Sequence, residues 1–110
     1  MLIFPLKKEW YEKIKSGEKT VEYREVKPYW RERFINYFQL DTDEMCDIGD
    51  AYIYSDKNLR AICKLRLGYT KKYMTARIIK IEVVDGKRTD LHIDKLVYAI
   101  HLANVKEVYN

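Results

Sequence analysis

Hydrophobic residues recur every three or four positions in two early segments of the chain, which is the spacing of an amphipathic helix. In the first segment, residues 8–16, the aromatic and aliphatic side chains of Trp10, Tyr11 and Ile14 share one side. Acidic residues come early in this segment and lysines come late, so the charges complement a helix dipole. We therefore expect a short helix that buries its apolar side and ends at Gly17.

The second segment, residues 28–39, begins with a proline, which suits the first turn of a helix. Trp30, Phe34 and Phe38 then follow at helical spacing. This pattern predicts a second helix over residues 28–39. Because Trp30 is in phase with the two phenylalanines, we expect its ring to lie in the core and not in a ligand site.

Between the two helices, polar and apolar residues alternate strictly over residues 19–26, which is typical of a half-buried strand. We expect the apolar face, with Val21 and Tyr23, to contact the core. The open face carries three polar side chains in register, those of Thr20, Glu22 and Arg24.

The rest of the chain consists mostly of segments with strand character, separated by turn residues. The predicted strands are residues 1–5, 51–54, 61–67, 77–84 and 97–102, the last running towards 105–109, with turns at 56–58 and 85–86. Five or six short strands and two early helices predict an α+β fold. We expect a strongly curved, mixed sheet closed into a small barrel, with the helices packed against it.

Length and composition describe one small globular domain. The 110 residues are 47% hydrophobic and 35% charged, with four glycines and two prolines, which excludes disordered and collagen-like chains. A chain of this length buries a single core, so we expect residues 1–110 to form one domain.

Charge is distributed unevenly along the chain. The formal net charge is +4, but residues 41–50 carry five carboxylates and no base, so the remainder carries +9. We expect residues 41–50 to form a loop that binds no calcium, because it lacks the central glycine and the bidentate glutamate of a calcium loop. The positive charge of the chain outside residues 41–50, together with its ten tyrosines, favours a polyanionic partner.

Cysteines and histidines are few and scattered. Cys46 and Cys63 have no C-x-x-C spacing, and with His92 and His101 they form no zinc pattern, so we expect reduced thiols, no metal and no cofactor. His101 lies in an apolar segment and is expected to be a hydrogen-bonded strand histidine. The opening apolar run is too short for a signal peptide, and no run approaches the roughly 20 residues of a membrane span. A cytoplasmic protein without membrane contact is expected.

One set of residues has a characteristic spacing: Gly17, Lys19, Glu22 and Arg24 form the pattern G-x-K-x-x-E-x-R. The segment that carries it, residues 6–24, resembles the start of ASCH domains, for which this pattern is the signature. A helix that ends at the glycine and a strand that carries the last two residues supply the expected context. The likeness continues through residues 27–30, 67–69, 78–84 and 97–102 and covers nearly the whole chain outside the acidic loop and residues 55–60.

The resemblance implies a PUA-like fold, in which a small β-barrel has a cleft lined by the signature residues. It also implies RNA binding, which is suspected for many members, or amidohydrolase activity on acetylated cytidine, which some small bacterial members have. The enzymatic members use a lysine and a threonine in the signature and a later glutamate. Here the lysine is Lys19, whereas Glu22 stands where the threonine would be. Glu82 is the only carboxylate in the predicted strand 77–84.

Aromatic residues next to cations add further candidates. Tyr29 lies near lysine and arginine residues, and Tyr69 is followed by Lys71 and Lys72. Single-stranded nucleic-acid sites use such pairs, with rings for the bases and cations for the phosphates. The candidate ligand-binding or RNA-binding residues are Lys7, Lys8, Lys19, Glu22, Arg24, Tyr29, Tyr69, Lys71 and Lys72.

We expect Lys19, Glu22 and Arg24 to converge on one solvent-reachable cleft, bounded by Tyr69 and by Lys7 or Lys8. Two classes of function are open for it. The first is a binding module for RNA or a nucleotide-like ligand. The second is a small metal-independent hydrolase, acting on an acylated nucleoside or as a ribonuclease, in which Lys19 and Glu22 are the catalytic pair. We favour the binding module, because the threonine is absent and the basic surplus needs no further assumption. The same charges also occur in plain ion-pair clusters.

Overall fold

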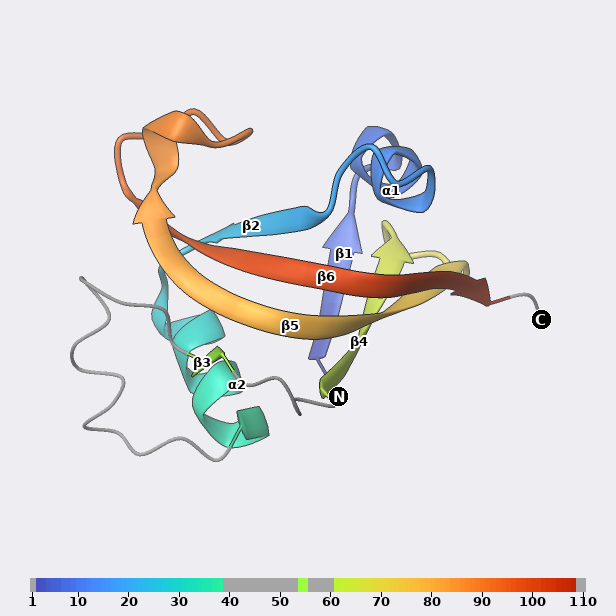
Figure 1. Ribbon diagram of the computed structural model, residues 1–110, viewed down its shortest axis with the longest axis horizontal. Coiled ribbons are helices and arrows are strands. Elements are labelled where there is room, and N and C mark those ends of the chain that lie inside the picture. Colours follow the sequence, from blue (N-terminus) through green and yellow to red (C-terminus); the bar gives the residue numbers. More distant parts are fainter. Residues whose placement is uncertain (1, 39–53, 56–60, 109–110) are drawn as a thin grey trace.

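The computed structural model describes residues 2–38, 54–55 and 61–108, and Figure 1 shows how their helices and strands are arranged. The elements are β1 (Leu2–Leu6), α1 (Lys8–Lys15), β2 (Val21–Glu25), α2 (Pro28–Phe38), β3 (Tyr54–Ser55), β4 (Ala61–Leu67), β5 (Tyr73–Asp85), the short 3₁₀ helix η1 (Gly86–Arg88) and β6 (Leu96–Val108). The predicted α+β class with two early helices is confirmed. The predicted acidic loop 41–50 and the turn 56–58 lie outside the described residues.

The sheet is mixed and strongly curled. Its strand order is β1-β4-β5-β6-β2, with β3 paired to β5 outside this path. The pair β1–β4 is parallel, and the other pairs are antiparallel. Among the described strands no pairing joins β1 to β2. The five strands therefore form a half-barrel, which confirms the predicted strongly curved, mixed sheet; its two edges remain unpaired with each other, so the predicted closure is not seen among the described strands.

The two longest strands differ from the prediction of short strands. β5 and β6 have 13 residues each and lie side by side as long curved ribbons in Figure 1. Their pairing contains register shifts between Thr75 and Arg77 and between Ile78 and Lys80. Such irregularities bend a strand and increase its twist, so a continuous pair can curl without a break. The predicted segments 77–84 and 97–102 are thus parts of longer strands.

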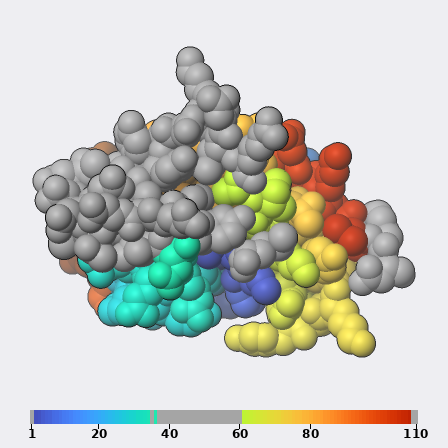
Figure 2. All heavy atoms as spheres, turned by 90° about the horizontal axis from the view of Figure 1, so that it is seen from below, coloured from blue at the N-terminus to red at the C-terminus, as the bar shows by residue number. Residues whose placement is uncertain are grey.

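The core fills the inside of the half-barrel, and each helix contributes to it. Tyr11 and Ile14 of α1 are fully buried, as predicted. From α2, Trp30 stacks on Phe4 at a centroid distance of 4.9 Å and on Phe34 at 6.0 Å, so it belongs to the core as predicted, but one side of it also lines the cavity described below, which the prediction excluded. Figure 2 shows the surface of α2 next to that of the N-terminal segment on the face seen from below.

The end of α1 follows the predicted glycine stop. Gly17 has φ +85°, in the left-handed region, and its amide N–H donates to the carbonyl oxygen of Ile14. Glycine adopts this conformation without the steric cost that a Cβ atom would impose. The turn aims the chain into β2 and sets the positions of Lys19 and Glu22.

The described part of the chain also bears on the cysteine and membrane expectations. Cys63 of β4 is a free, fully buried thiol, as expected, and burial raises its pKa to about 12. Cys46 lies outside the described residues. None of the helices that the structure describes combines the length and the apolar character required to span a bilayer.

Candidate functional site

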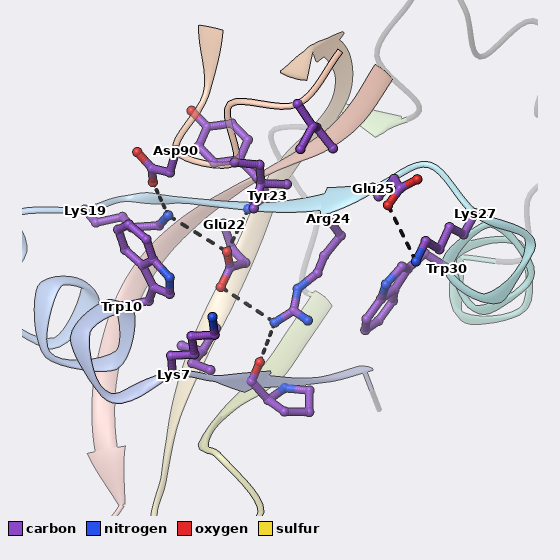
Figure 3. A pocket seen from close by; sticks show the side chains of 14 residues that line it. Lys7, Trp10, Lys19, Glu22, Tyr23, Arg24, Glu25, Lys27, Trp30 and Asp90 are labelled. Atoms are coloured by element: carbon purple, nitrogen blue, oxygen red, sulfur yellow. Dashed lines mark hydrogen bonds and ion pairs between the residues drawn. The ribbon is translucent and has the colours of Figure 1, made fainter. Parts of the chain in front are cut away.

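A cavity of about 430 Å³ lies where the two edges of the half-barrel, β1 and β2, come close. Its walls come from both edge strands, from α1, from the start of α2 and from the segment between η1 and β6 (Figure 3). We call it the seam cavity. Its charged lining residues are Lys7, Lys19, Glu22, Arg24, Glu25, Lys27 and Asp90.

Glu22 is the most buried charged residue of this cavity, with 5% of its surface exposed. The backbone N–H of Tyr23 donates to Oε1 at 2.8 Å, whereas the buried Oε2 accepts no hydrogen bond. Burial raises the pKa of the Glu22 carboxyl above its usual value, although Arg24 and Lys19 act in the opposite direction. The prediction that Glu22 lies on the open, solvent-facing side of this strand is therefore wrong. The strand can bury a carboxylate here because two cations flank it.

Arg24 links the two edges of the sheet. Its Nη2 donates to the backbone carbonyl oxygen of Pro5 in β1 at 2.6 Å and lies 3.7 Å from Oε2 of Glu22. The guanidinium carbon is 5.5 Å from the ring centroid of Phe4 and 5.3 Å from that of Trp30. Burial lowers the pKa of Arg24, and the Glu22 carboxylate counters this effect. Nε of Arg24 is buried and donates no hydrogen bond.

Lys19 is held by rings and carboxylates together. Its Nζ lies 4.5 Å from the ring centroid of Trp10 and 5.2 Å from that of Tyr23, a geometry that stabilises a cation. The same ammonium group contacts the Asp90 carboxylate directly and lies 3.9 Å from Oε1 of Glu22. Only 10% of the Lys19 side chain is exposed. Figure 3 shows Lys19 between Trp10 and Asp90, pointing towards Glu22.

Of the nine candidate residues, four line the seam cavity. Lys19, Glu22 and Arg24 converge there, and Lys7 reaches it from the end of β1 (Figure 3). The remaining five do not line it: Lys8, Tyr29, Tyr69, Lys71 and Lys72. Tyr69 lies on the turn after β4, is 92% exposed and is not among the residues that line the cavity. Whether these residues bind a ligand stays a prediction.

Two of the excluded candidates have other contacts. Tyr29 is 52% exposed, and the guanidinium carbon of Arg33 lies 3.3 Å from its ring centroid. Nζ of Lys72 is 3.7 Å from Oε2 of Glu107 and 5.8 Å from the ring centroid of Tyr11. Lys72 therefore joins a cluster between α1 and the end of β6, away from the seam cavity.

Trp10, Tyr23 and Asp90 are cavity residues that sequence reasoning missed. Trp10 was placed on the buried face of the first helix, and Tyr23 on the core face of the strand. Both rings are instead partly exposed and line the cavity. An aromatic residue beside a signature position was a usable signal for Tyr23. Asp90 is 71 residues from Lys19 in the chain, so no local spacing points to it.

His101 and Glu82 lie apart from the seam cavity and line a separate cavity of about 330 Å³. Nε2 of His101 and Oε1 of Glu82 form a hydrogen bond of 2.9 Å, which confirms the expected strand histidine. This hydrogen bond is the main cause that lowers the pKa of Glu82. In the stretches of chain that the structure describes, no three histidine, cysteine or acidic side chains are grouped so that they could hold a metal ion.

Fold and site together define a small α+β protein: a curled five-strand half-barrel with a charged, aromatic-walled cavity between its edges. No family model matches the chain, and comparison with curated proteins and with solved structures gives no match either.

Proposed function

We propose that this chain is an ASCH domain of the PUA-like superfamily and binds single-stranded RNA or a nucleotide-like ligand in the seam cavity. The convergence of Lys19, Glu22 and Arg24 in one cavity supports the family assignment, because these residues form the signature. The cavity volume of about 430 Å³ lies within the roughly 300–1,000 Å³ of small-molecule sites.

The buried carboxylate of Glu22 is the observation on which the binding proposal depends. Its Oε2 accepts no hydrogen bond, and the neighbouring Nε of Arg24 donates none. An unsatisfied buried polar group costs about 1–3 kcal/mol, and because both atoms are shielded from solvent, a ligand gains affinity from them when the side chains around them move aside. The edge of a nucleobase offers N–H donors next to acceptor atoms, which complements this pair.

The aromatic walls fit the same kind of ligand. Trp10 and Tyr23 stand on either side of the Lys19 ammonium, and Trp30 lies beside Arg24. Flat bases stack on such rings, while cations attract the phosphates of a single strand. Lys7 and Lys27 add positive charge at the cavity wall.

Titration of the purified chain with fluorescently labelled single-stranded RNA tests the proposal through anisotropy. We expect saturable binding that weakens with salt, with a log–log slope near −3 if about four phosphates are contacted. Glu22→Gln, which keeps the shape of the side chain, should weaken binding, because the amide NH₂ replaces an acceptor. Absence of binding, or binding that ignores both salt and Glu22→Gln, refutes the proposal.

A hydrolase is the second candidate, and the Lys19–Glu22–Asp90 cluster favours it. Burial raises the pKa of the Glu22 carboxyl, which favours its use as a group that exchanges protons, and Nζ of Lys19 lies 3.9 Å from its Oε1. Such an enzyme would cleave the acyl group of an acylated nucleoside or an RNA phosphodiester without a metal. Turnover of acetylated cytidine that disappears in Lys19→Ala would support this function, and turnover that survives in Lys19→Ala would exclude the assignment.

A cytoplasmic location belongs to the same proposal. Cys63 is buried as a free thiol with its pKa raised to about 12, which keeps it in the unreactive protonated form. A reduced, buried cysteine is typical of proteins in reducing compartments.

A further inference from the structure

The seam cavity has a neighbour. A second cavity of about 340 Å³ is lined by Lys13, Glu18, Thr20 and Val21, together with four residues that it shares with the seam cavity. We call it the outer cavity. The shared residues are Trp10, Lys19, Tyr23 and Asp90. The two cavities therefore meet at the Lys19–Asp90 ion pair.

Lys19, the cation of this pair, has further contacts that do not involve Asp90. Trp10 and Tyr23 flank the Lys19 ammonium, and Glu22 remains a partner at 3.9 Å. Lys19 therefore keeps its place if Asp90 turns away. Nζ of Lys13 lies 5.1 Å from the Trp10 ring centroid and brings a second cation to the outer cavity.

Asp90, the anion of the pair, lies on a segment whose backbone is held in place by hydrogen bonds and close packing. The carbonyl oxygen of Gly86 accepts hydrogen bonds from the backbone N–H groups of Thr89 and Ile93 and from the Thr89 hydroxyl. A Cβ atom at Gly86 would lie 2.5 Å from the carbonyl oxygen of Lys95, so the chain packs tightly there. The Asp90 side chain projects from this segment and is 39% exposed. It can leave Lys19 by rotating its own side-chain torsions.

We propose that the Asp90 carboxylate occupies the position of a ligand phosphate beside Lys19, so that a phosphate-bearing ligand binds by displacing it. This inference rests on the proposed function and specifies the ligand class: one with a phosphate, bound with its base in the seam cavity and its next group in the outer cavity. Carboxylate and phosphate oxygens are both anionic acceptors for an ammonium group. The internal ion pair lowers the apparent affinity, because only molecules with Asp90 displaced are competent to bind.

The decisive variant is Asp90→Asn, which keeps the size of the side chain and removes its charge. We expect it to bind a short single-stranded RNA and a nucleoside 5′-monophosphate about three- to fivefold more tightly, the size of a partly exposed ion pair. The corresponding unphosphorylated nucleoside should bind with unchanged affinity. An equal gain for the nucleoside would overturn the proposal.

Two comparisons separate local competition from a general charge effect. Asp94→Asn removes the same charge from the same segment, but Asp94 is 86% exposed and pairs with Lys87 at 3.2 Å. We expect no comparable gain from this control. In a Lys19→Gln background, Asp90→Asn should also lose its effect, because no ammonium remains to compete for. A gain of similar size in either case overturns the proposal.

A further measurement does not depend on RNA binding. Inorganic phosphate is titrated into Asp90→Asn and the wild type while the indole N–H signal of Trp10 is followed by NMR. We expect a saturable shift at lower phosphate concentration in Asp90→Asn and none in the Lys19→Gln/Asp90→Asn variant. If this holds while RNA fails to bind, the phosphate site stands and the RNA function fails. Equal titrations in the wild type and Asp90→Asn reject the phosphate site.

Discussion

Two buried carboxylates, those of Glu107 and Glu22, lie close to cations but differ in how their oxygens are satisfied. The Glu107 side chain is 5% exposed and the Glu22 side chain 7%. Glu107 accepts a hydrogen bond of 2.9 Å from the Tyr11 hydroxyl and lies within 3.7 Å of Lys15 and Lys72. Glu22 has an oxygen without a hydrogen bond and faces a cavity.

The contrast separates a structural ion cluster from a candidate site. Both clusters combine a carboxylate with nearby cations, and a sequence pattern shows only these charges. What distinguishes Glu22 is incomplete pairing next to space that a ligand can fill, whereas Glu107 ties α1 to the end of β6. We therefore expect substitutions at Glu107 to act on stability and substitutions in the seam cavity to act on binding.

The largest expected effect is on stability, from Glu107→Gln. This change removes a charged acceptor from Tyr11 and two lysines, and hydrogen bonds to charged groups contribute about 1.5–3 kcal/mol. We expect the free energy of unfolding in urea to fall by about 2 kcal/mol. The matched change Glu22→Gln should cost at most about 1 kcal/mol, because burial already disfavours the charged form there. Equal losses would erase the distinction between the two clusters.

The next effect concerns binding, through Trp10→Ala. Loss of a stacking ring costs about 1–3 kcal/mol per base, so the affinity for single-stranded RNA should fall by at least about fivefold. The salt dependence should stay the same, because no phosphate contact is removed. Lys15→Gln is the control from the Glu107 cluster and should leave affinity unchanged. RNA binding that tolerates Trp10→Ala would place the ligand outside the seam cavity.

A smaller loss of stability is expected for Arg24→Lys. Lysine keeps the charge next to Glu22 but lacks the planar group that also reaches the carbonyl oxygen of Pro5. We expect a loss of about 1 kcal/mol in urea unfolding, the typical net contribution of a hydrogen bond. A variant as stable as the wild type would show that the link between the two edges contributes nothing to folding.

The subtlest test is the pH dependence of stability. Because the pKa of Glu22 is raised in the folded protein, its stabilising contribution is present below the unfolded pKa and is lost as pH rises through the folded pKa. The stability of the wild type relative to Glu22→Gln should therefore fall as pH increases from about 4.3. The pKa of Glu82 is lowered, so Glu82→Gln should show the opposite sign: the wild type loses its advantage as pH falls. Curves of the same sign would contradict this assignment.

Much of the fold was predictable, because helices and strands that pack one face against a core repeat their hydrophobic residues at a regular spacing. The predicted strand 61–67 coincides with β4, and both helices begin where the pattern placed them. The length of β5 and β6 was not predictable, because their outer ends pair polar residues such as Thr75 and Lys106. The half-barrel also depends on register shifts that no alternation pattern reveals.

The candidate site was predictable only where its residues are neighbours in sequence. Alternation along β2 places Glu22 and Arg24 on the same face, and the chain just before β2 brings Lys19 beside them. Their burial was missed, because alternation alone assigns charges to solvent. Asp90 reaches Lys19 only through the packing of the segment between η1 and β6 against β2. No local rule contains that information.

The bond between Arg24 and Pro5 has a consequence for solubility. A half-barrel has two free edges, and an edge strand is a template on which other chains can add strands and aggregate. Pro5 has no N–H to offer a foreign strand, and its carbonyl oxygen already accepts from Arg24. Pro5 and Arg24 thereby shield this edge from strand addition, although in the strands that the structure describes no backbone hydrogen bonds pair the two edges with each other. The fold thus keeps a cavity between its two edges while Pro5 and Arg24 block strand addition at the β1 edge.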